Sequence, residues 1–245
     1  NILELVPAKR QNLLFSATIT DEVEKLMNAN VLVVGLGGVG GICAEMIARA
    51  GVGKMTIVDA DTVDASNKNR QIPALTSTEG LNKVEVMAAR IRDINPAIQL
   101  RVLNEFVRDD RTDEILEEEQ FDYAVDCIDT LSPKVFFIKA CLDKNIPIVS
   151  SMGAGGKVDP SQIKVVDISN TYQCNLAKYV RKRLYHLGTR KGVKVVFSPE
   201  AADKTKIIET PNAFPKKSII GTVSYMPAMF GCTMASVVIR DLMEA

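Results

Sequence analysis

A glycine-rich stretch early in the chain has the composition of a phosphate-binding turn. GLGGVG supplies Gly35, Gly37, Gly38 and Gly40 between a β-branched run and a segment with helical spacing. Glycine lets the backbone turn tightly against a phosphate, and the start of the following helix offers N–H groups and a positive dipole. Asp59 ends the next apolar run, about twenty residues on, where a carboxylate binds ribose hydroxyls. The two features predict nucleotide binding; the alternative is a turn that serves only helix–sheet packing.

The segment after Asp59 carries more anion-binding side chains than a redox cofactor needs. These residues are Asp61, Asn67, Asn69, Arg70, Gln71 and, at the start of the next expected helix, Lys83. A glycine turn already serves the phosphates of a dinucleotide, whereas additional Arg and Lys charges suit a triphosphate whose pyrophosphate departs. The alternative for Arg70 and Lys83 is solvated surface charge.

A carboxylate for a metal ion follows a later strand. Asp129 belongs to VDCIDT, where the expected strand ends. Mg²⁺ binds through one or two carboxylates plus phosphate oxygens, so Asp129 is a candidate Mg²⁺ ligand. No GxxxxGK[ST] stretch occurs in the sequence, which excludes a Walker-type ATPase. The pattern therefore favours adenylation of a carboxylate by ATP in a Rossmann-like crevice.

These side chains need parallel strands to bring them together. We predict strands at 29–34, 55–58, 99–103, 123–126, 146–151 and 193–198, and helices at 42–50, 82–94, 132–143 and 175–187. The β-α-β order predicts an α/β, Rossmann-like, mostly parallel twisted sheet with helices on both faces, to which the C-terminal part adds further strands and helices. Ligands lie at the carboxyl ends of such strands, so GLGGVG, VDADTVD and CIDT should converge on one crevice.

Composition limits the remaining possibilities. Lys+Arg and Asp+Glu are both 30, so any basic surface must be local. The five cysteines form no C-x-x-C pair, which argues against a disulfide framework and a four-thiolate zinc site and suits a reducing cytoplasm. Residues 218–239 are uncharged and long enough to span a bilayer, but Gly221, Pro227 and Gly231 favour a strand, a loop and a buried helix. We expect no signal peptide and no stable membrane insertion.

One helix is strongly basic. The expected helix at 175–187 carries Lys178, Arg181, Lys182 and Arg183. Such a cluster suits contacts with RNA phosphates, whereas the alternative is an ordinary solvated helix face. Tyr179 and Tyr185 on the same helix could stack on bases, although half-buried tyrosines are commoner on helices.

Five stretches resemble a known family: VLVVGLGGVGG, AGVGKMTIVDADTVDASNKNRQ, GLNKVEV, INP and VDCIDT. They are similar to the ATP-dependent adenylating superfamily of ubiquitin-activating-like enzymes, which includes bacterial activators of sulfur-carrier proteins. The resemblance implies that Gly38 and Asp59 bind the nucleotide. It also implies that Asn67, Arg70 and Lys83 serve the phosphates and catalysis, and that Asp129 holds Mg²⁺.

The second half resembles one branch of that superfamily, the tRNA threonylcarbamoyladenosine dehydratases. The similar stretches are SSMGAGGKVDPSQIKVVDI, KYVRKRL, VVFSPE and GTVSYMPAMFG. The branch implies ATP-dependent activation of the threonine carboxylate of threonylcarbamoyl-adenosine, beside the tRNA anticodon, followed by cyclisation. It further implies ATP and Mg²⁺, with a monovalent cation as a further candidate and no zinc. The expected partners are tRNA, a second copy in a homodimer and a sulfurtransferase-type protein.

Three other functions stay open at this point. The first is an enzyme that activates the C-terminal glycine of a small sulfur-carrier or ubiquitin-like protein. The second is a NAD-dependent oxidoreductase, against which the Asn67, Arg70 and Lys83 set argues. The third is an RNA-binding protein whose nucleotide site is vestigial.

The start of the chain departs from the family pattern. Residues 1–28 resemble the segment around the Ser-Ala-Thr motif of DEAD-box RNA helicases, with Ser16, Ala17 and Thr18, although the ATP motifs of a helicase are absent from the sequence. We interpret 1–28 as an atypical segment from a fused or chimeric start, in which DEVEKLMN can still serve as a lead-in helix. We predict an adenylating domain at 29–245, with a nucleotide-binding core at 29–151 and a substrate and tRNA part at 152–245.

Overall fold

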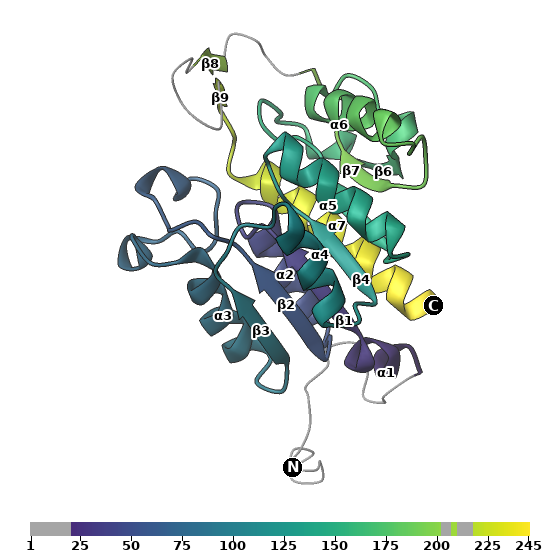
Figure 1. Ribbon diagram of the computed structural model, residues 1–245. Coiled ribbons are helices and arrows are strands. Elements are labelled where there is room, and N and C mark those ends of the chain that lie inside the picture. Colours follow the sequence, from purple (N-terminus) through teal and green to yellow (C-terminus); the bar gives the residue numbers. More distant parts are fainter. Residues whose placement is uncertain (1–20, 202–206, 210–217) are drawn as a thin grey trace.

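The computed structural model describes residues 21–201, 207–209 and 218–245, without the side chains of 207–209 and 218–220. The resemblance at Ser16-Ala17-Thr18 lies outside the described residues. Within them, the main sheet has seven strands in the order β3-β2-β1-β4-β5-β7-β6 (Figure 1). The strands are β1 (Asn30–Val34), β2 (Lys54–Val58), β3 (Gln99–Leu103), β4 (Tyr123–Asp126), β5 (Ile148–Ser151), β6 (Lys164–Asp167) and β7 (Lys194–Phe197).

All neighbouring strands in this sheet run parallel except β6, which pairs antiparallel with β7. A separate antiparallel pair joins β8 (Ile207–Glu209) to β9 (Ser218–Ile220). The α-helices are α1 (Asp21–Asn28), α2 (Gly40–Arg49), α3 (Lys83–Ile94), α4 (Asp110–Glu118), α5 (Leu131–Asp143), α6 (Asn175–His186) and α7 (Tyr225–Glu244). The predicted mostly parallel α/β architecture is therefore confirmed.

Each face of the sheet carries its own apolar core. Val31 and Val33 of β1 pack with α2, α3 and α7, whereas the alternate residues Leu32 and Val34 pack with α4, α5 and α6. Successive side chains of a strand point to opposite faces, so a strand covered on both sides must be apolar throughout. Val31 to Val34 meet that requirement, and all five residues of the strand, including the polar Asn30, are buried.

The sequence prediction missed one helix. The segment of α4, DRTDEILEE, is rich in acids and carries only two large apolar residues. The structure buries Thr112, Ile115 and Leu116, whose spacing puts one short face of the helix against the sheet. So small an apolar face does not stand out in the sequence without the surface that covers it.

The strand order creates the crevice. The chain passes from β1 outwards through β2 to β3, and then returns to place β4 on the other side of β1. Such a reversal opens a space at the carboxyl ends of the two strands that flank it, where ligands of α/β proteins bind. The residues that follow β1, β2 and β4 therefore surround the candidate site.

Helix α7 packs in the core as the sequence pattern predicts. Among the described residues, it alone is long and apolar enough to cross a membrane by length and composition, and half of the apolar window is buried inside the protein. Phe230, Met234 and Val238 are fully buried against α2 and the sheet. These contacts account for the apolar character of the helix without a bilayer.

Gly231 in α7 provides a stability test. A Cβ atom at this position would overlap the carbonyl oxygen of Val39 and lie 3.0 Å from Cβ of Ile42. Gly→Ala in an exposed helix interior stabilises by about 1 kcal/mol, but overpacking costs about 1–3 kcal/mol. We expect Gly231→Ala to lower the urea midpoint, and Ser236→Ala, at an exposed site on α7, to leave it nearly unchanged. A raised midpoint for Gly231→Ala would contradict this packing.

Candidate functional site

The glycine turn packs directly on the turn after β4. Gly35 has φ +89°, and a Cβ atom there would lie 2.8 Å from the carbonyl oxygen of Cys127. A Cβ at Gly40 would overlap the carbonyl oxygen of Gly35, and one at Gly38 would lie 2.9 Å from Cβ of Pro227. At Gly37 an added Cβ would make only ordinary contacts, with Nε2 of Gln71 at 3.7 Å. The protein's own packing therefore requires glycine at 35, 38 and 40 but not at 37.

Asp59 links the glycine turn to the loop after β2. Its Oδ2 accepts a 2.6 Å hydrogen bond from the backbone N–H of Leu36, and its Oδ1 accepts one of 2.8 Å from that of Asp61. Burial raises the pKa of Asp59, although these two hydrogen bonds and the charge of Lys83 oppose the rise. A carboxylate has about four acceptor positions, so Asp59 retains capacity for ligand hydroxyls.

Lys83 is a buried cation beside Asp59. It begins α3, and its Nζ lies 2.9 Å from Oδ2 of Asp61. The Lys83 side chain is 6% exposed and that of Asp61 is 58% exposed. Lys83 is thus buried and its partner Asp61 is open to solvent. The alternative that Lys83 is an ordinary solvated surface charge therefore does not hold.

Arg70 lies against the glycine turn. Its carbonyl oxygen would lie 3.2 Å from a Cβ at Gly38. The guanidinium NH1 donates to the carbonyl oxygen of Ser66 at 3.0 Å and to Oδ1 of Asn69 at 2.8 Å. Asn69 in turn donates from Nδ2 to the carbonyl oxygen of Thr222 at 3.0 Å. Both acceptors of Arg70 are neutral, so these hydrogen bonds orient the guanidinium without cancelling its charge.

The two buried amides of the same loop differ in their role. Asn67 accepts a hydrogen bond from the backbone N–H of Asp64 and completes the cap of η2 (Ala65–Asn67), so its Oδ1 serves the local fold. Gln71 is buried beside the glycine turn, and its Oε1 has no hydrogen-bond partner in the described part of the chain. An unsatisfied buried acceptor costs about 1–3 kcal/mol. A ligand that donates a hydrogen bond to Gln71 would remove that penalty.

Asp129 lies just past the carboxyl end of β4, at the same edge of the sheet as the glycine turn. It is exposed in the turn between β4 and α5, one residue after Ile128, whose backbone nitrogen lies against Gly35. In the described residues, no group of three or more His, Cys, Asp or Glu side chains could hold a metal ion. A metal at Asp129 would therefore need further oxygen ligands from phosphate or water, which is the way Mg²⁺ commonly binds.

Sequence reasoning missed a buried ion pair beneath Asp129. The side chains of Asp126 and Lys134 are both fully buried, with Nζ 2.6 Å from Oδ2. Lys134 also donates to Oγ of Ser150 at 3.2 Å and to the carbonyl oxygen of Ser151 at 2.9 Å. Oδ1 of Asp126 accepts from the backbone N–H of Ile128 at 3.0 Å. The network thus joins β4, β5 and α5 to the turn that presents Asp129; an acid at the end of a buried strand was the sequence signal for it.

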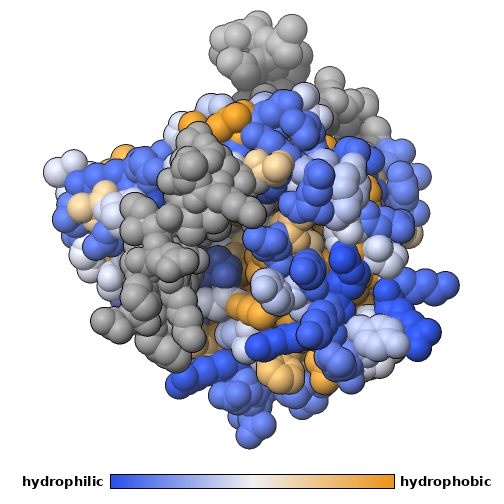
Figure 2. Space-filling model, turned by 90° about the horizontal axis from the view of Figure 1, so that it is seen from above, coloured by the Kyte–Doolittle hydropathy of each residue, from blue (hydrophilic) through white to orange (hydrophobic). Residues whose placement is uncertain are grey.

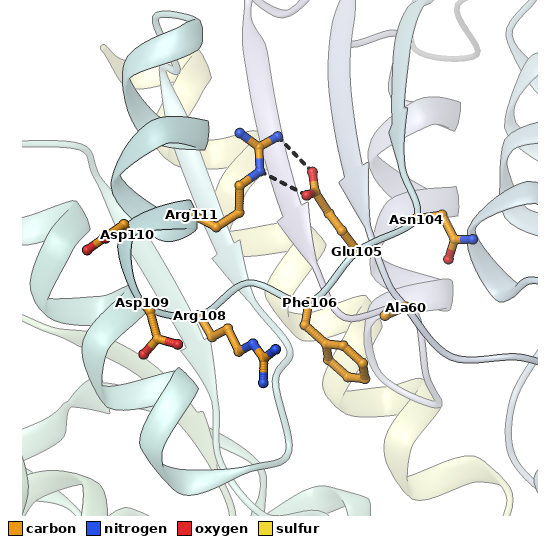
Figure 3. Close-up of a pocket in the computed structure, with 8 residues that line it drawn as sticks. All are labelled: Ala60, Asn104, Glu105, Phe106, Arg108, Asp109, Asp110 and Arg111. Atoms are coloured by element: carbon orange, nitrogen blue, oxygen red, sulfur yellow. Dashed lines mark hydrogen bonds and ion pairs between the residues drawn. The ribbon is translucent and has the colours of Figure 1, made fainter.

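A cavity of about 650 Å³ begins at Ala60, the residue that follows Asp59. Its lining runs from Ala60 at the end of β2 to the loop between β3 and α4, and comprises Ala60, Asn104, Glu105, Phe106, Arg108, Asp109, Asp110 and Arg111 (Figure 3). Glu105 and Arg111 form a fork with two hydrogen bonds of 2.8 Å. Figure 3 shows the Phe106 ring and the Arg108 guanidinium on the other side of the loop from this fork, with the ring beside Ala60. Phe106 is 65% exposed, so its ring is available to a ligand.

Comparison with known proteins assigns the family. The sequence matches the ThiF family over residues 9–245. The chain belongs to the ThiF family. Among its ThiF-type relatives, the tRNA threonylcarbamoyladenosine dehydratase of Bacillus subtilis is 39% identical over 91% of this chain and 90% of its own length. The enzyme of the same name from Escherichia coli is 39% identical over 88% of this chain and 87% of its length. The predicted resemblance is confirmed.

Solved structures of the E. coli enzyme match the ThiF fold of this chain closely. Its crystal structure in complex with ATP has a TM-score of 0.82 and 37% sequence identity, and the match covers 91% of this chain and 89% of that one. A complex with AMP matches equally well, with a TM-score of 0.82. The E. coli sulfur carrier protein ThiS adenylyltransferase matches a shorter stretch of this chain, with 34% identity over 56% of it.

The structure divides the basic residues of α6 in this ThiF-family chain. Lys178, Lys182 and Arg183 are exposed. Arg181 is half-buried, and its NH1 donates to the carbonyl oxygen of Thr171 at 2.7 Å. Arg181 therefore serves the fold, and we leave it out of the candidate RNA surface.

The structure brings the predicted nucleotide residues of the ThiF-family fold together in one crevice. Asp59, Asp61, Arg70, Gln71 and Lys83 contact each other or the glycine turn, and Asp129 follows Ile128, whose backbone nitrogen lies against Gly35. Asn69 holds Arg70, and Asn67 caps the loop that carries both.

Proposed function

We propose that this chain is an ATP-dependent tRNA threonylcarbamoyladenosine dehydratase. The proposal is supported chiefly by relatives of that name that are 39% identical along about nine-tenths of both chains. The crevice supports it independently, because a glycine turn, a ribose-type acid and two cations meet at the carboxyl ends of β1 and β2. The substrate is a tRNA that carries threonylcarbamoyl-adenosine, and cytoplasmic location and a homodimer are part of the proposal.

In this proposal the triphosphate lies over the glycine turn. The start of α2 has no side-chain cap, so its backbone N–H groups face the phosphates. Asp59 accepts from the ribose hydroxyls and Gln71 receives a donor for its unpaired Oε1. The adenine enters the cavity beside Ala60 and stacks on Phe106.

The cavity makes a testable prediction for Phe106. We expect Phe106→Ala to weaken ATP binding about 10-fold by isothermal titration calorimetry, since a base stacked on an aromatic ring gains about 1–3 kcal/mol. Phe136→Ala is the matched control, because Phe136 is 54% exposed on α5 and lines none of the cavity. Equal ATP affinity in Phe106→Ala and the parent would place the adenine elsewhere.

The reaction joins a carboxylate to the α-phosphorus of ATP. A threonine carboxylate oxygen attacks that phosphorus, and the bond to pyrophosphate breaks. Arg70 and Lys83 balance the negative charge that grows on the phosphates. A nucleophile within the modification then attacks the activated carbonyl and AMP leaves, so the nucleoside loses one water overall.

Asp129 is the residue that would hold Mg²⁺ in this site. When bound, the ion would supply positive charge that offsets part of the charge of the departing pyrophosphate. A monovalent cation, an absence of zinc and a sulfurtransferase-type partner stay predictions from the family resemblance.

The direct test is the mass of the modified nucleoside. The chain is incubated with ATP, magnesium and tRNA that carries threonylcarbamoyl-adenosine, and the nucleosides are then analysed by mass spectrometry. We expect loss of one water per modified nucleoside, and no change when ATP is omitted. An unchanged mass in the presence of protein that binds ATP would refute the proposal.

An alternative function is activation of a small carrier protein, which the match to the ThiS adenylyltransferase favours. The two functions separate in an ATP–pyrophosphate exchange assay. Exchange stimulated by a carrier with a C-terminal glycine, but not by modified tRNA, would support the alternative.

A further inference from the structure

All the Lys, Arg, Asp and Glu residues in the segment from α6 to β7 are positively charged. Residues 175–194 contain Lys178, Arg181, Lys182, Arg183, Arg190, Lys191 and Lys194 and no Asp or Glu. Two of these cations have fixed roles, since Arg181 donates to Thr171 and Lys194 pairs with Asp241 at 2.5 Å. The rest still form a local field strong enough to attract a polyanion, although the whole chain is neutral.

The cations share one side of α6. Ala177, Val180 and Leu184 are buried against the core of the sheet. Residues three and four apart lie one above another on a helix, so Lys178, Lys182 and Tyr185 form one solvent-facing row and Tyr179 and Arg183 a second. Figure 2, seen from above, shows strongly hydrophilic side chains with less polar ones between them on this side of the molecule.

The tyrosines of this face are about half open to solvent. Tyr179 and Tyr185 are each 54% exposed, so part of each ring is available to a ligand. The Arg190 guanidinium lies 5.0 Å from the centroid of the Tyr185 ring. An aromatic ring left this exposed beside a cation loses hydrophobic stabilisation unless a ligand covers it.

The face also adjoins the crevice. The NH1 of Arg183 donates at 2.6 Å to Oγ of Ser132, in the first turn of α5. Ser132 lies three residues after Asp129, which lies at the same edge of the sheet as the glycine turn. Helices α5 and α6 pack side by side (Figure 1). A strand bound along α6 would therefore lead towards the reacting end of the crevice.

We propose that the α6 face, defined as Lys178, Tyr179, Lys182, Arg183, Tyr185 and Arg190, binds single-stranded RNA. The tyrosines stack on unpaired bases while the cations contact phosphates. Duplex RNA offers phosphates and hydroxyls but keeps its bases stacked inside, so exposed rings favour a single strand. This inference rests on the proposed function, because it names how the RNA substrate is held.

The test compares two RNA probes by fluorescence anisotropy over a range of salt concentrations. One probe is a single-stranded oligonucleotide, and the other is the same sequence in a blunt duplex. We expect the parent chain to bind the single strand more tightly. The double variant Tyr179→Ala, Tyr185→Ala should bind it about 10- to 100-fold more weakly with an unchanged salt slope. The matching Tyr→Phe double variant should keep the parent affinity.

The cations should act differently from the tyrosines. Lys178→Ala and Lys182→Ala should each reduce the slope of log affinity against log salt by about 0.7 on the single strand. Lys54→Ala is the matched control, because Lys54 is exposed at the amino end of β2, which three strands separate from β7 in the sheet. It should leave the slope as in the parent.

Three binding results would overturn the proposal. They are parent-like RNA affinity in the tyrosine double variant, equal binding of duplex and single strand, and binding of anionic vesicles without RNA binding. Calorimetric ATP binding by every variant checks that the fold is intact. Tyrosine-dependent RNA binding without dehydration would leave this surface standing and refute the proposed reaction. Dehydration at the parent rate by the tyrosine double variant would leave the proposed reaction standing and refute RNA binding by this surface.

Discussion

Replacing Arg70 with alanine is expected to lower the rate of modified-tRNA-dependent ATP–pyrophosphate exchange by about 10²–10³, the usual cost of removing one charge-stabilising donor from an active site. The structure explains why so large a loss is expected. The backbone carbonyl of Arg70 lies against Gly38, and the guanidinium donates its two hydrogen bonds to neutral oxygens of Ser66 and Asn69. The guanidinium is thus oriented in advance and keeps its full charge for the triphosphate.

The control for this experiment lies two residues away. Lys68 belongs to the same loop, but its Nζ pairs with Glu79 at 2.8 Å. Lys68→Ala should leave the exchange rate near that of the parent. The comparison distinguishes the loss of the Arg70 guanidinium from a general loss of positive charge in the loop. Arg70→Lys should recover only part of the rate, because an ammonium cannot make paired parallel hydrogen bonds. An unchanged exchange rate in Arg70→Ala would remove Arg70 from the reaction.

The second large effect is expected at Lys134. Its ion pair with Asp126 is fully buried, so Lys134→Met leaves a buried carboxylate without its counter-charge. Breaking such a pair costs about 3–5 kcal/mol. For a chain of this size each kcal/mol lowers the melting temperature by about 2–4 °C, so we expect a fall on the order of 10 °C by calorimetry.

A neighbouring lysine supplies the comparison for this prediction. Lys139 lies on the same helix and pairs with Asp143, but both side chains are partly exposed. Exposed pairs contribute about 0–1 kcal/mol, so Lys139→Met should change the melting temperature little. The double variant Lys134→Met, Asp126→Leu should recover much of the loss, because no charge is then left buried. Equal melting temperatures in Lys134→Met and Lys139→Met would show that the buried pair carries no special cost.

The sequence was sufficient to predict the crevice for specific physical reasons. NVLVV and KMTIV form strands that are mostly apolar and buried, and Gly35 and Asp59 follow directly at their ends. Position after a parallel strand decides where such residues meet, so Gly35, Asp59 and Asp129 could be placed together before any contact was known.

Other features depended on contacts that no local pattern encodes. The burial of Lys134 requires Asp126 and Ser150 from two other elements, and Arg181 faces inwards because Thr171 lies beside it. The cavity beside Phe106 arises where the end of β2 meets the loop before α4. The exposure of Tyr179 and Tyr185 likewise follows from which side of α6 the sheet covers.

The contact between Gly231 and Val39 has a consequence for biosynthesis. Helix α2 is made early and α7 is made late, and the two helices bury each other's apolar sides. A ribosome adds about 5–20 residues per second, so α2 waits on the order of ten seconds or more for its cover. During that interval the apolar side of α2 beside the glycine turn is uncovered. We expect chaperones to bind the nascent chain there until translation reaches α7.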